Sequence, residues 1–172
     1  MFKKIYILLT MLFLSPEKYL RRKGVIIGKG CDIQTRDFGS EPYLIEIGDR
    51  VQITSGVKLF THGGGWIFRK EYPDFDTFGK IKIGNNVYIG NNAMIMPGVT
   101  IADDCIIGAG SIVTKSFLDH GIIIAGVPAI KVGKVEDLKE RLIPFNLKTK
   151  GLSYTAKKKF LLSQPDSAFL KK

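Results

Sequence analysis

Residues 83–117 read IGNNVY IGNNAM IMPGVT IADDCI IGAGSI VTKSF, and an aliphatic residue opens every hexad of this stretch. This period differs from the 3.6 residues of a helix and the 2.0 residues of a half-buried strand. A strict hexapeptide period is typical of a solenoid, the parallel β-helix. We therefore predict an all-β solenoid. The fifth residue of each hexad is small or apolar and should also be buried: Val87, Ala93, Val99, Cys105, Ser111 and Phe117.

Three hexads close one triangular coil of such a solenoid, so every third hexad should stack on the same side, about 4.8 Å from its neighbour. The expected stacked pairs are Ile83 with Ile101, Ile89 with Ile107, and Ile95 with Val113. Between the aliphatic positions the corners need left-handed or tightly turned backbone, which Gly and Asn tolerate. The residue pairs at these corners are Asn85-Asn86, Asn91-Asn92, Pro97-Gly98, Asp103-Asp104 and Ala109-Gly110.

The same period can be traced upstream with two interruptions, which sets the domain boundaries. We assign residues 25–134 to the solenoid, with a short excursion near 37–44 and an inserted loop at about 62–80. An insertion can leave a solenoid at a corner without disturbing its coils, and long loops in compact domains usually carry function. Residues 1–24 are assigned to an N-terminal helical segment, and residues 135–172 to a C-terminal helix and a basic tail.

Both ends of the chain are predicted to contain short helices. The apolar run Ile5–Leu14 is too short to span a bilayer, and no small-residue cleavage site follows it. It either packs against the protein, including a neighbouring subunit, or rests on a membrane surface. Ser15 and Pro16 read as the N-cap and the first position of a second helix. A further helix is expected over Val135–Leu142, followed by a loosely held, Lys-rich tail.

The net charge of +10 belongs to the two ends of the chain. Residues 1–24 hold six Lys or Arg and one Glu (+5), and residues 144–172 hold seven Lys and one Asp (+6). The rest holds thirteen basic and fourteen acidic residues (−1). A nucleic-acid-binding protein would show a basic stripe on its folded body, so no nucleic-acid partner is expected. Basic ends suit an anionic membrane surface, or they confer solubility alone.

The cysteines and the triple glycine offer little chemistry. Cys31 and Cys105 both occupy the fifth position of a hexad and are expected to be buried, reduced thiols, with no sign of an oxidising compartment. Gly63–Gly65 lacks the Lys-Ser/Thr of a phosphate-binding loop. A three-histidine zinc site would need both histidines, His62 and His120, shared across subunits. We therefore predict no metal.

His62 is the candidate catalytic residue. It stands where a regular coil gives way to the inserted loop, so it is both anchored and exposed to a substrate. Free histidine titrates at about pH 6.5, which suits general-base catalysis at neutral pH. His120 lies in the turn sequence Asp119-His120-Gly121 and is read as a surface residue.

Several stretches resemble the hexapeptide-repeat acyltransferases, a family that includes galactoside, maltose, serine, streptogramin and polysaccharide acetyltransferases. The matching stretches are Gly84–Asn92, Pro97–Ile101, Ile107–Lys115 and Ala125–Ala129. Ser15–Tyr19 and Gly39–Leu44 look most like the branch that acts on bacterial surface polysaccharides. The resemblance implies a left-handed parallel β-helix, an exception to the right-handed crossover rule. It also implies a homotrimer with active sites between the subunits.

The resemblance further implies which residues bind coenzyme A. Some positions match those where the family holds the coenzyme, largely through backbone groups and the pantetheine arm. They are Asn91, Ala109, Thr114 and Lys115, with Tyr88 beside the acyl pocket. Either Lys131 or Lys134 should face the phosphate of the coenzyme. Ile130 occupies the position where relatives often have a basic residue, so the choice between the two lysines stays open.

For catalysis, the resemblance matches His62 to the histidine that precedes the loop in the family. Gln34 and Glu41 lie where relatives place polar groups that bind the acceptor. Trp66 and the other aromatic residues of the loop suit stacking on a sugar, and equally on an antibiotic macrocycle. The three glycines after His62 are unlike many relatives, and the residue that orients the histidine is not identified.

These residues together predict an O-acetyltransferase that uses acetyl-CoA and acts on a sugar hydroxyl, in the synthesis of capsule, O-antigen or exopolysaccharide. His62 would take the proton from the hydroxyl as it attacks the thioester. The enzyme should work in the cytoplasm or at the inner face of the membrane. Alternatives are an amino sugar, serine or antibiotic acceptor, or a non-catalytic binding solenoid. A γ-type carbonic anhydrase is disfavoured by the histidine count.

Overall fold

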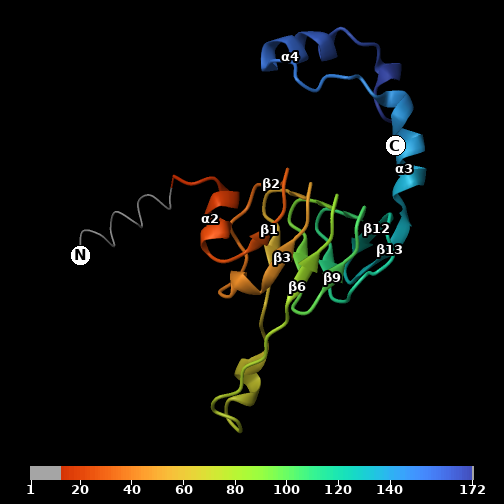
Figure 1. Ribbon diagram of the computed structural model, residues 1–172. Helices are drawn as coiled ribbons and strands as arrows, with labels where there is room; N and C mark the ends of the chain where they lie inside the picture. The colour runs from red at the N-terminus through yellow and green to blue at the C-terminus, as the bar shows by residue number, and fades with distance from the viewer. Residues whose placement is uncertain (1–12, 172) are drawn as a thin grey trace. The chain divides into compact units, whose positions relative to one another are not determined.

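The computed structural model describes residues 13–171, and the chain divides into two compact units at residues 135 and 136. The first unit contains a solenoid of three sheets (Figure 1). The four-stranded sheet contains β1 (Ile26–Ile27), β3 (Ile45–Ile47), β6 (Ile81–Ile83) and β9 (Thr100–Ile101). The six-stranded sheet contains β2 (Asp32–Ile33), β4 (Gln52–Ile53), β7 (Tyr88–Ile89), β10 (Ile106–Ile107), β12 (Ile122–Gly126) and β13 (Ala129–Lys134). The three-stranded sheet contains β5 (Lys58–Leu59), β8 (Met94–Ile95) and β11 (Ile112–Val113).

The chain visits the three sheets in turn, so the predicted triangular coil is confirmed. All strand pairs are parallel except β12 and β13, which form an antiparallel hairpin at the end of the six-stranded sheet. The predicted stacking is also confirmed. Paired residues are Ile83 with Ile101, Ile89 with Ile107, and Ile95 with Val113.

The core is a column of these aliphatic side chains together with the fifth residues of the hexads. Ile89, Ile95 and Ile107 are completely buried, and Ala93 and Cys105 are buried beside them. At each predicted corner the second residue of the turn-prone pair has a positive φ angle, as Gly and Asn allow. These residues are Asn86, Asn92, Gly98, Asp104 and Gly110.

The helix predicted at Pro16 is present as α2 (Pro16–Arg22), and the Ser15 hydroxyl caps it by accepting a hydrogen bond from the Lys18 N–H. Most of the run Ile5–Leu14, residues 5–12, lies outside the described residues. Two 3₁₀ turns, η1 (Pro42–Leu44) and η2 (Gly65–Phe68), belong to the two excursions of the chain.

The second unit is helical and has no buried residue in its α-helices. It contains α3 (Val135–Leu142), which begins in the last residue of the first unit, η3 (Ile143–Phe145), α4 (Tyr154–Leu162) and η4 (Asp166–Ala168). The helix α3 has the predicted bounds, whereas α4 lies in the tail for which the sequence predicted no helix. The capping side chain of Ser153 at the start of α4 gives the physical reason. No helix within residues 13–171 has the length and apolar character needed to cross a bilayer.

The prediction of two buried thiols is wrong for Cys31. Both cysteines are free, but only Cys105 is buried, and Cys31 is half-buried. Cys31 directly precedes β2, the end strand of its sheet, so a coil stacks on it from one side only. Burial raises the pKa of the Cys105 thiol, which keeps it protonated at neutral pH.

Substitution of a core side chain should lower the free energy of unfolding more when that side chain is more deeply buried. We expect Ile89→Ala to lower the free energy of unfolding by about 2–5 kcal/mol, because it leaves a cavity in a close-packed column. Ile26→Ala is the matched control, since Ile26 lies in β1 with 63% of its surface exposed. Urea unfolding at one protein concentration measures both, and equal losses for the two variants would contradict this core.

Candidate active site

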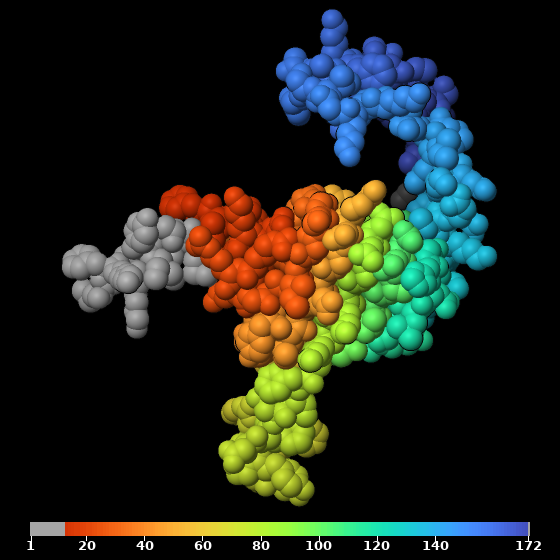
Figure 2. Space-filling model, in the orientation of Figure 1, coloured from red at the N-terminus to blue at the C-terminus, as the bar shows by residue number. Residues whose placement is uncertain are grey.

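Two excursions of the chain rejoin the solenoid at the same sheet on consecutive coils, the first at β3 and the second at β6. The first follows β2 and covers residues 34–44, and the second follows β5 and covers residues 62–80. The Leu59 N–H donates a hydrogen bond to the Asp37 carbonyl at 3.2 Å, which holds the first excursion against the next coil. Figures 1 and 2 show the second excursion extending away from the coils as a yellow-green arm.

The two excursions bring Glu41 and His62 together. The Nδ1 atom of His62 lies 2.7 Å from Oε2 of Glu41, and the Thr61 hydroxyl donates to the same oxygen at 3.0 Å. An ionised carboxylate only accepts hydrogen bonds, so Nδ1 carries the proton. The Nε2 atom is then left with a free lone pair. The His62 side chain is 39% exposed and that of Glu41 only 17%, so the carboxylate is sheltered while the imidazole is open to a substrate.

The electrostatics of this pair favour the ionised carboxylate. Burial alone would raise the pKa of Glu41, but hydrogen bonds from Thr61, Ser40 and His62 outweigh it and lower that pKa below its ordinary value of 4.5. Glu41 is therefore charged at neutral pH, and it fixes both the tautomer and the orientation of the imidazole.

The returning end of the 62–80 loop holds His62 from the other side. His62 and Phe78 form an isolated antiparallel bridge, and their rings are 5.7 Å apart at an angle of 52°. The Gly79 N–H donates to the Thr61 carbonyl at 2.7 Å. A Cβ atom on Gly79 would lie 2.2 Å from the backbone nitrogen of Gly98, so only glycine allows this close approach to the next coil.

Thr114 and Lys115 occupy the same corner as His62, two coils further along the solenoid. Backbone hydrogen bonds of 2.9 and 3.0 Å join the three successive coils at this corner. At the usual spacing between strands, the two sites are about 10 Å apart along the axis. Both residues are exposed, and the Lys115 ammonium lies 5.6 Å from the ring centre of Phe117.

Tyr88, Asn91 and Ala109 lie at a different corner, where the six-stranded sheet passes to the three-stranded sheet. The carbonyl of Asn91 accepts a hydrogen bond from the Gly110 N–H at 2.8 Å, which stacks Asn91 beside Ala109. Tyr88 is in β7 and is 40% exposed. Within one chain, the structure does not bring these three residues to His62.

The two candidate lysines of the hairpin strand β13 differ in their environment. The Lys131 ammonium forms an ion pair with Asp119 at 3.1 Å. Lys134 is exposed, and the described residues give it no ion pair. Lys134 therefore has its charge available for a ligand.

Of the three residues predicted to bind the acceptor, only Glu41 contacts His62. The Gln34 amide follows β2 and donates to Asp32 at 3.0 Å. Trp66 lies in η2 on the loop and is 81% exposed. His120 is exposed in a turn, as predicted.

The chain is similar to known hexapeptide-repeat proteins. A family model described as bacterial transferase hexapeptide (six repeats) matches residues 80–115. Protein CapG of Staphylococcus aureus is 48% identical over 166 residues, which cover 94% of this chain and 95% of CapG. The chain belongs to the hexapeptide-repeat acetyltransferase family.

Sugar acetyltransferases are among the similar proteins of this family. The galactoside O-acetyltransferase of Escherichia coli K12 is 39% identical over 98 residues, which cover 56% of this chain and about half, 47%, of that enzyme. A maltose O-acetyltransferase structure from Clostridium difficile 630 matches with a TM-score of 0.57 and 26% identity, over 69% of this chain and 74% of that one. A galactoside acetyltransferase in complex with coenzyme A matches with a TM-score of 0.57 and 28% identity, over 72% of each chain.

As in these family members, the solenoid is a left-handed parallel β-helix, and the predicted fold is confirmed. The prediction that the chain is an acetyltransferase is confirmed as well. Among residues 13–171 there is no group of three His, Cys, Asp or Glu side chains that could hold a metal ion.

The sequence did not identify the partner of the imidazole, although a signal was present. The hexad count resumes after both excursions on the same side of the triangular coil, at β3 and at β6 of the four-stranded sheet. They therefore rejoin the solenoid at the same sheet, one coil apart. Asp37 and Glu41 are the two acidic residues of the first excursion, and His62 opens the second.

Proposed function

We propose that this acetyltransferase transfers an acetyl group from acetyl-CoA to a hydroxyl of a sugar used to build a bacterial surface polysaccharide. The observation that carries the proposal is the 2.7 Å pair between His62 and Glu41, on the same corner as Thr114 and Lys115. The sugar acetyltransferases among the similar proteins support a sugar acceptor. The near full-length similarity to CapG and the stretches 15–19 and 39–44 support the polysaccharide setting.

In this mechanism His62 is the general base. Its Nε2 atom removes the proton of the acceptor hydroxyl while the oxygen attacks the thioester carbonyl, and the imidazolium then protonates the departing coenzyme A thiolate. Glu41 acts as a positioning residue that keeps Nδ1 protonated, and its acceptor-binding role stays a prediction. The oxyanion needs a hydrogen-bond donor, typically worth about 3 kcal/mol.

Neither cysteine is suited to act as a covalent nucleophile, which favours direct transfer between two bound substrates. Cys105 is completely buried and its pKa is raised by burial, so it is a poor nucleophile. The half-buried Sγ of Cys31 lies 3.3 Å from the carbonyl oxygen of Gly48, away from the corner of His62. We therefore expect a ternary complex and no acetyl-enzyme.

We infer that coenzyme A extends along the corner from His62 past Thr114 and Lys115, with its phosphate near β13. Lys134 is the better candidate for the phosphate, because Lys131 is already paired with Asp119. We expect Lys134→Gln to raise the KM for acetyl-CoA roughly fivefold, the effect of about 1 kcal/mol from an exposed ion pair. Lys131→Gln is the matched control, and steady-state kinetics that show the larger effect for Lys131 would reverse the assignment.

We infer that the active site is completed between subunits of a homotrimer. The predicted coenzyme-binding residues occupy two corners of one chain, with Thr114 on the corner of His62 and Asn91 on the other. A neighbouring copy can bring its own second corner beside the first. Analytical ultracentrifugation should give three times the chain mass of 19.1 kDa, and a monomer that retains full activity would contradict this arrangement.

The acceptor is tested by coenzyme A release with nucleotide sugars, oligosaccharides and amino sugars, and with serine and chloramphenicol as alternatives. We expect turnover with a sugar hydroxyl, in the cytoplasm or at the inner face of the membrane. Faster turnover of an amine or an antibiotic would replace the sugar as the acceptor. Calorimetry that detects no coenzyme A binding would favour a non-catalytic solenoid.

A further inference from the structure

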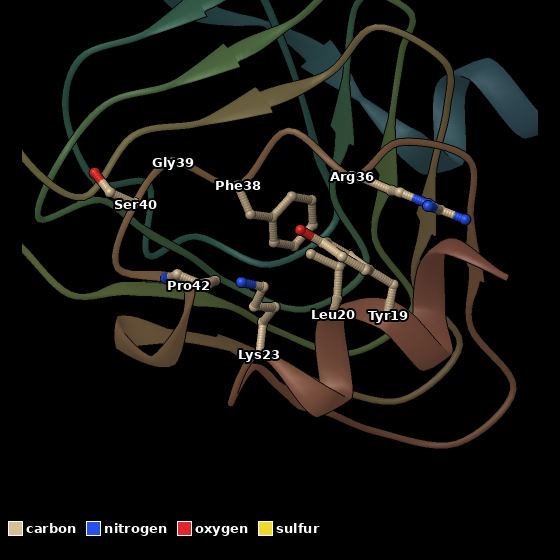
Figure 3. A pocket seen from close by; sticks show the side chains of 8 residues that line it. All are labelled: Tyr19, Leu20, Lys23, Arg36, Phe38, Gly39, Ser40 and Pro42. Atoms are coloured by element: carbon tan, nitrogen blue, oxygen red, sulfur yellow. The ribbon is translucent and has the colours of Figure 1, made fainter. Parts of the chain in front are cut away.

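A hollow of about 150 Å³ lies between α2 and the first excursion of the chain, and we call it the α2 hollow. Its floor is apolar, because Leu20 and Phe38 are each only 1% exposed. Its polar walls are Tyr19, Lys23, Arg36 and Ser40. Figure 3 shows the Tyr19 hydroxyl and the Lys23 ammonium extending toward the same opening, near the ring of Pro42.

The α2 hollow carries positive charge. The Lys23 ammonium lies 5.9 Å and the Arg36 guanidinium 5.1 Å from the ring centre of Tyr19, so one ring gathers both cations. No acidic side chain is among the described residues that line the hollow. The acidic residues that lie next to the lining in the sequence are Glu17, Asp37 and Glu41, and each is paired with another side chain: Arg21, Lys58 and His62, respectively. A ligand group bound here would therefore be an anion.

The α2 hollow is connected to the candidate active site through Ser40. Ser40 lines the hollow, and its side chain forms a hydrogen bond with Glu41, whose carboxylate contacts His62. Gly39, with a φ angle of +65°, brings this loop so close to the corner that a Cβ atom would lie 3.6 Å from the Thr61 hydroxyl oxygen. One loop thus forms a wall of the hollow and holds the residue that orients the imidazole.

The volume limits what the α2 hollow can hold. A site for a whole drug-sized ligand usually measures about 300–1,000 Å³. The hollow is smaller and fits one charged group with part of a sugar ring. This describes a subsite for a portion of the acceptor, linked to His62 through Ser40 and Glu41.

We propose that the α2 hollow binds the anionic group of the acceptor, so that the substrate is a sugar carrying a carboxylate or a phosphate. This rests on the proposed function, and it names the class of sugar. Lys23 supplies the charge that contacts the anion, Tyr19 supplies a hydroxyl group, and the apolar floor packs against the ring. The Arg36 guanidinium donates to the Leu14 carbonyl and adds positive charge from behind Tyr19.

The test compares matched acceptors in the coenzyme A release assay: methyl glycosides of glucose and galactose, the corresponding uronic acids, and the 6-phosphates. We expect a KM about tenfold lower for one charged series than for the neutral sugars, and the better series shows whether the anion is a carboxylate or a phosphate. Lys23→Gln should remove this preference and leave kcat and the KM for acetyl-CoA within twofold. Arg22→Gln, one residue away and outside the hollow, should keep the preference.

Titration calorimetry of the same sugars with the full-length protein gives a second readout that does not need turnover. Binding of a charged sugar should weaken about tenfold in Lys23→Gln and stay unchanged in Arg22→Gln. Equal KM values for neutral and charged sugars, or equal effects of the two substitutions, would overturn the inference while leaving acetyl transfer intact. Failure of every sugar in both assays would instead count against the proposed function as well.

Discussion

His62→Ala is expected to lower kcat at least about 100-fold, because removal of a general base typically costs between 10² and 10⁴ in rate. The dissociation constant for coenzyme A should stay within about twofold, since the imidazole acts on the acceptor hydroxyl. Coenzyme A release measures the rate, and calorimetry measures the binding. His62 lies outside the buried core, so the variant should stay folded and lose only the small stability contribution of its pair with Glu41.

The second histidine offers a matched control for this experiment. His120 is exposed in a turn, and its one resolved electrostatic effect is a small contribution to lowering the pKa of Asp103, after the hydrogen bonds from Asn85. His120→Ala should therefore keep the native kcat. A near-native rate in His62→Ala, or an equal loss in His120→Ala, would remove His62 from the role of base.

Glu41→Gln should lower kcat about 10- to 100-fold with little change in the KM for acetyl-CoA. The neutral amide no longer forces the proton onto Nδ1, so part of the protein holds the imidazole in the wrong tautomer. The loss of the corresponding carboxylate in a serine-protease triad costs about 10⁴-fold, and we expect less here because His62 is partly exposed. Glu46→Gln, which removes an exposed ion pair with Lys82, is the control and should leave kcat unchanged.

The same pair gives a pH dependence with a definite sign. Glu41 has a lower pKa in the folded protein than in the unfolded chain, so its contribution to stability is present above about pH 4.5 and is lost as pH falls further. Glu41→Gln should therefore lose less stability than the native protein as the pH falls. Urea unfolding of both proteins from about pH 3 to about pH 7 measures the difference in their stability. Parallel curves would show that the pair is absent in solution.

The core of the solenoid could be predicted from the sequence because each hexad is stacked on a hexad of the same kind. The period therefore encodes both burial and register, as in the pairing of Ile89 with Ile107. The corners could be predicted for a similar reason, since a positive φ angle restricts the residue type at Asn86 or Gly110.

The excursions have no such period, and this is where prediction was incomplete. The hexad count places the two excursions one coil apart, but it does not show that Glu41 and His62 will meet, because their contact depends on the paths of two loops. The α2 hollow was also missed, since Lys23 and Ser40 come from different segments. Cys31 was misjudged because the period does not show where the stack of coils ends.

Acetyl transfer by this enzyme requires an imidazole and a thioester to meet at one corner of the solenoid. The most direct measurement is a crystal structure of the protein with bound coenzyme A. We expect the thiol sulfur within about 4 Å of the Nε2 atom of His62, a distance suited to reaction, with Nδ1 still paired to Glu41. A thiol bound at another corner, or an imidazole turned away from it, would contradict the account.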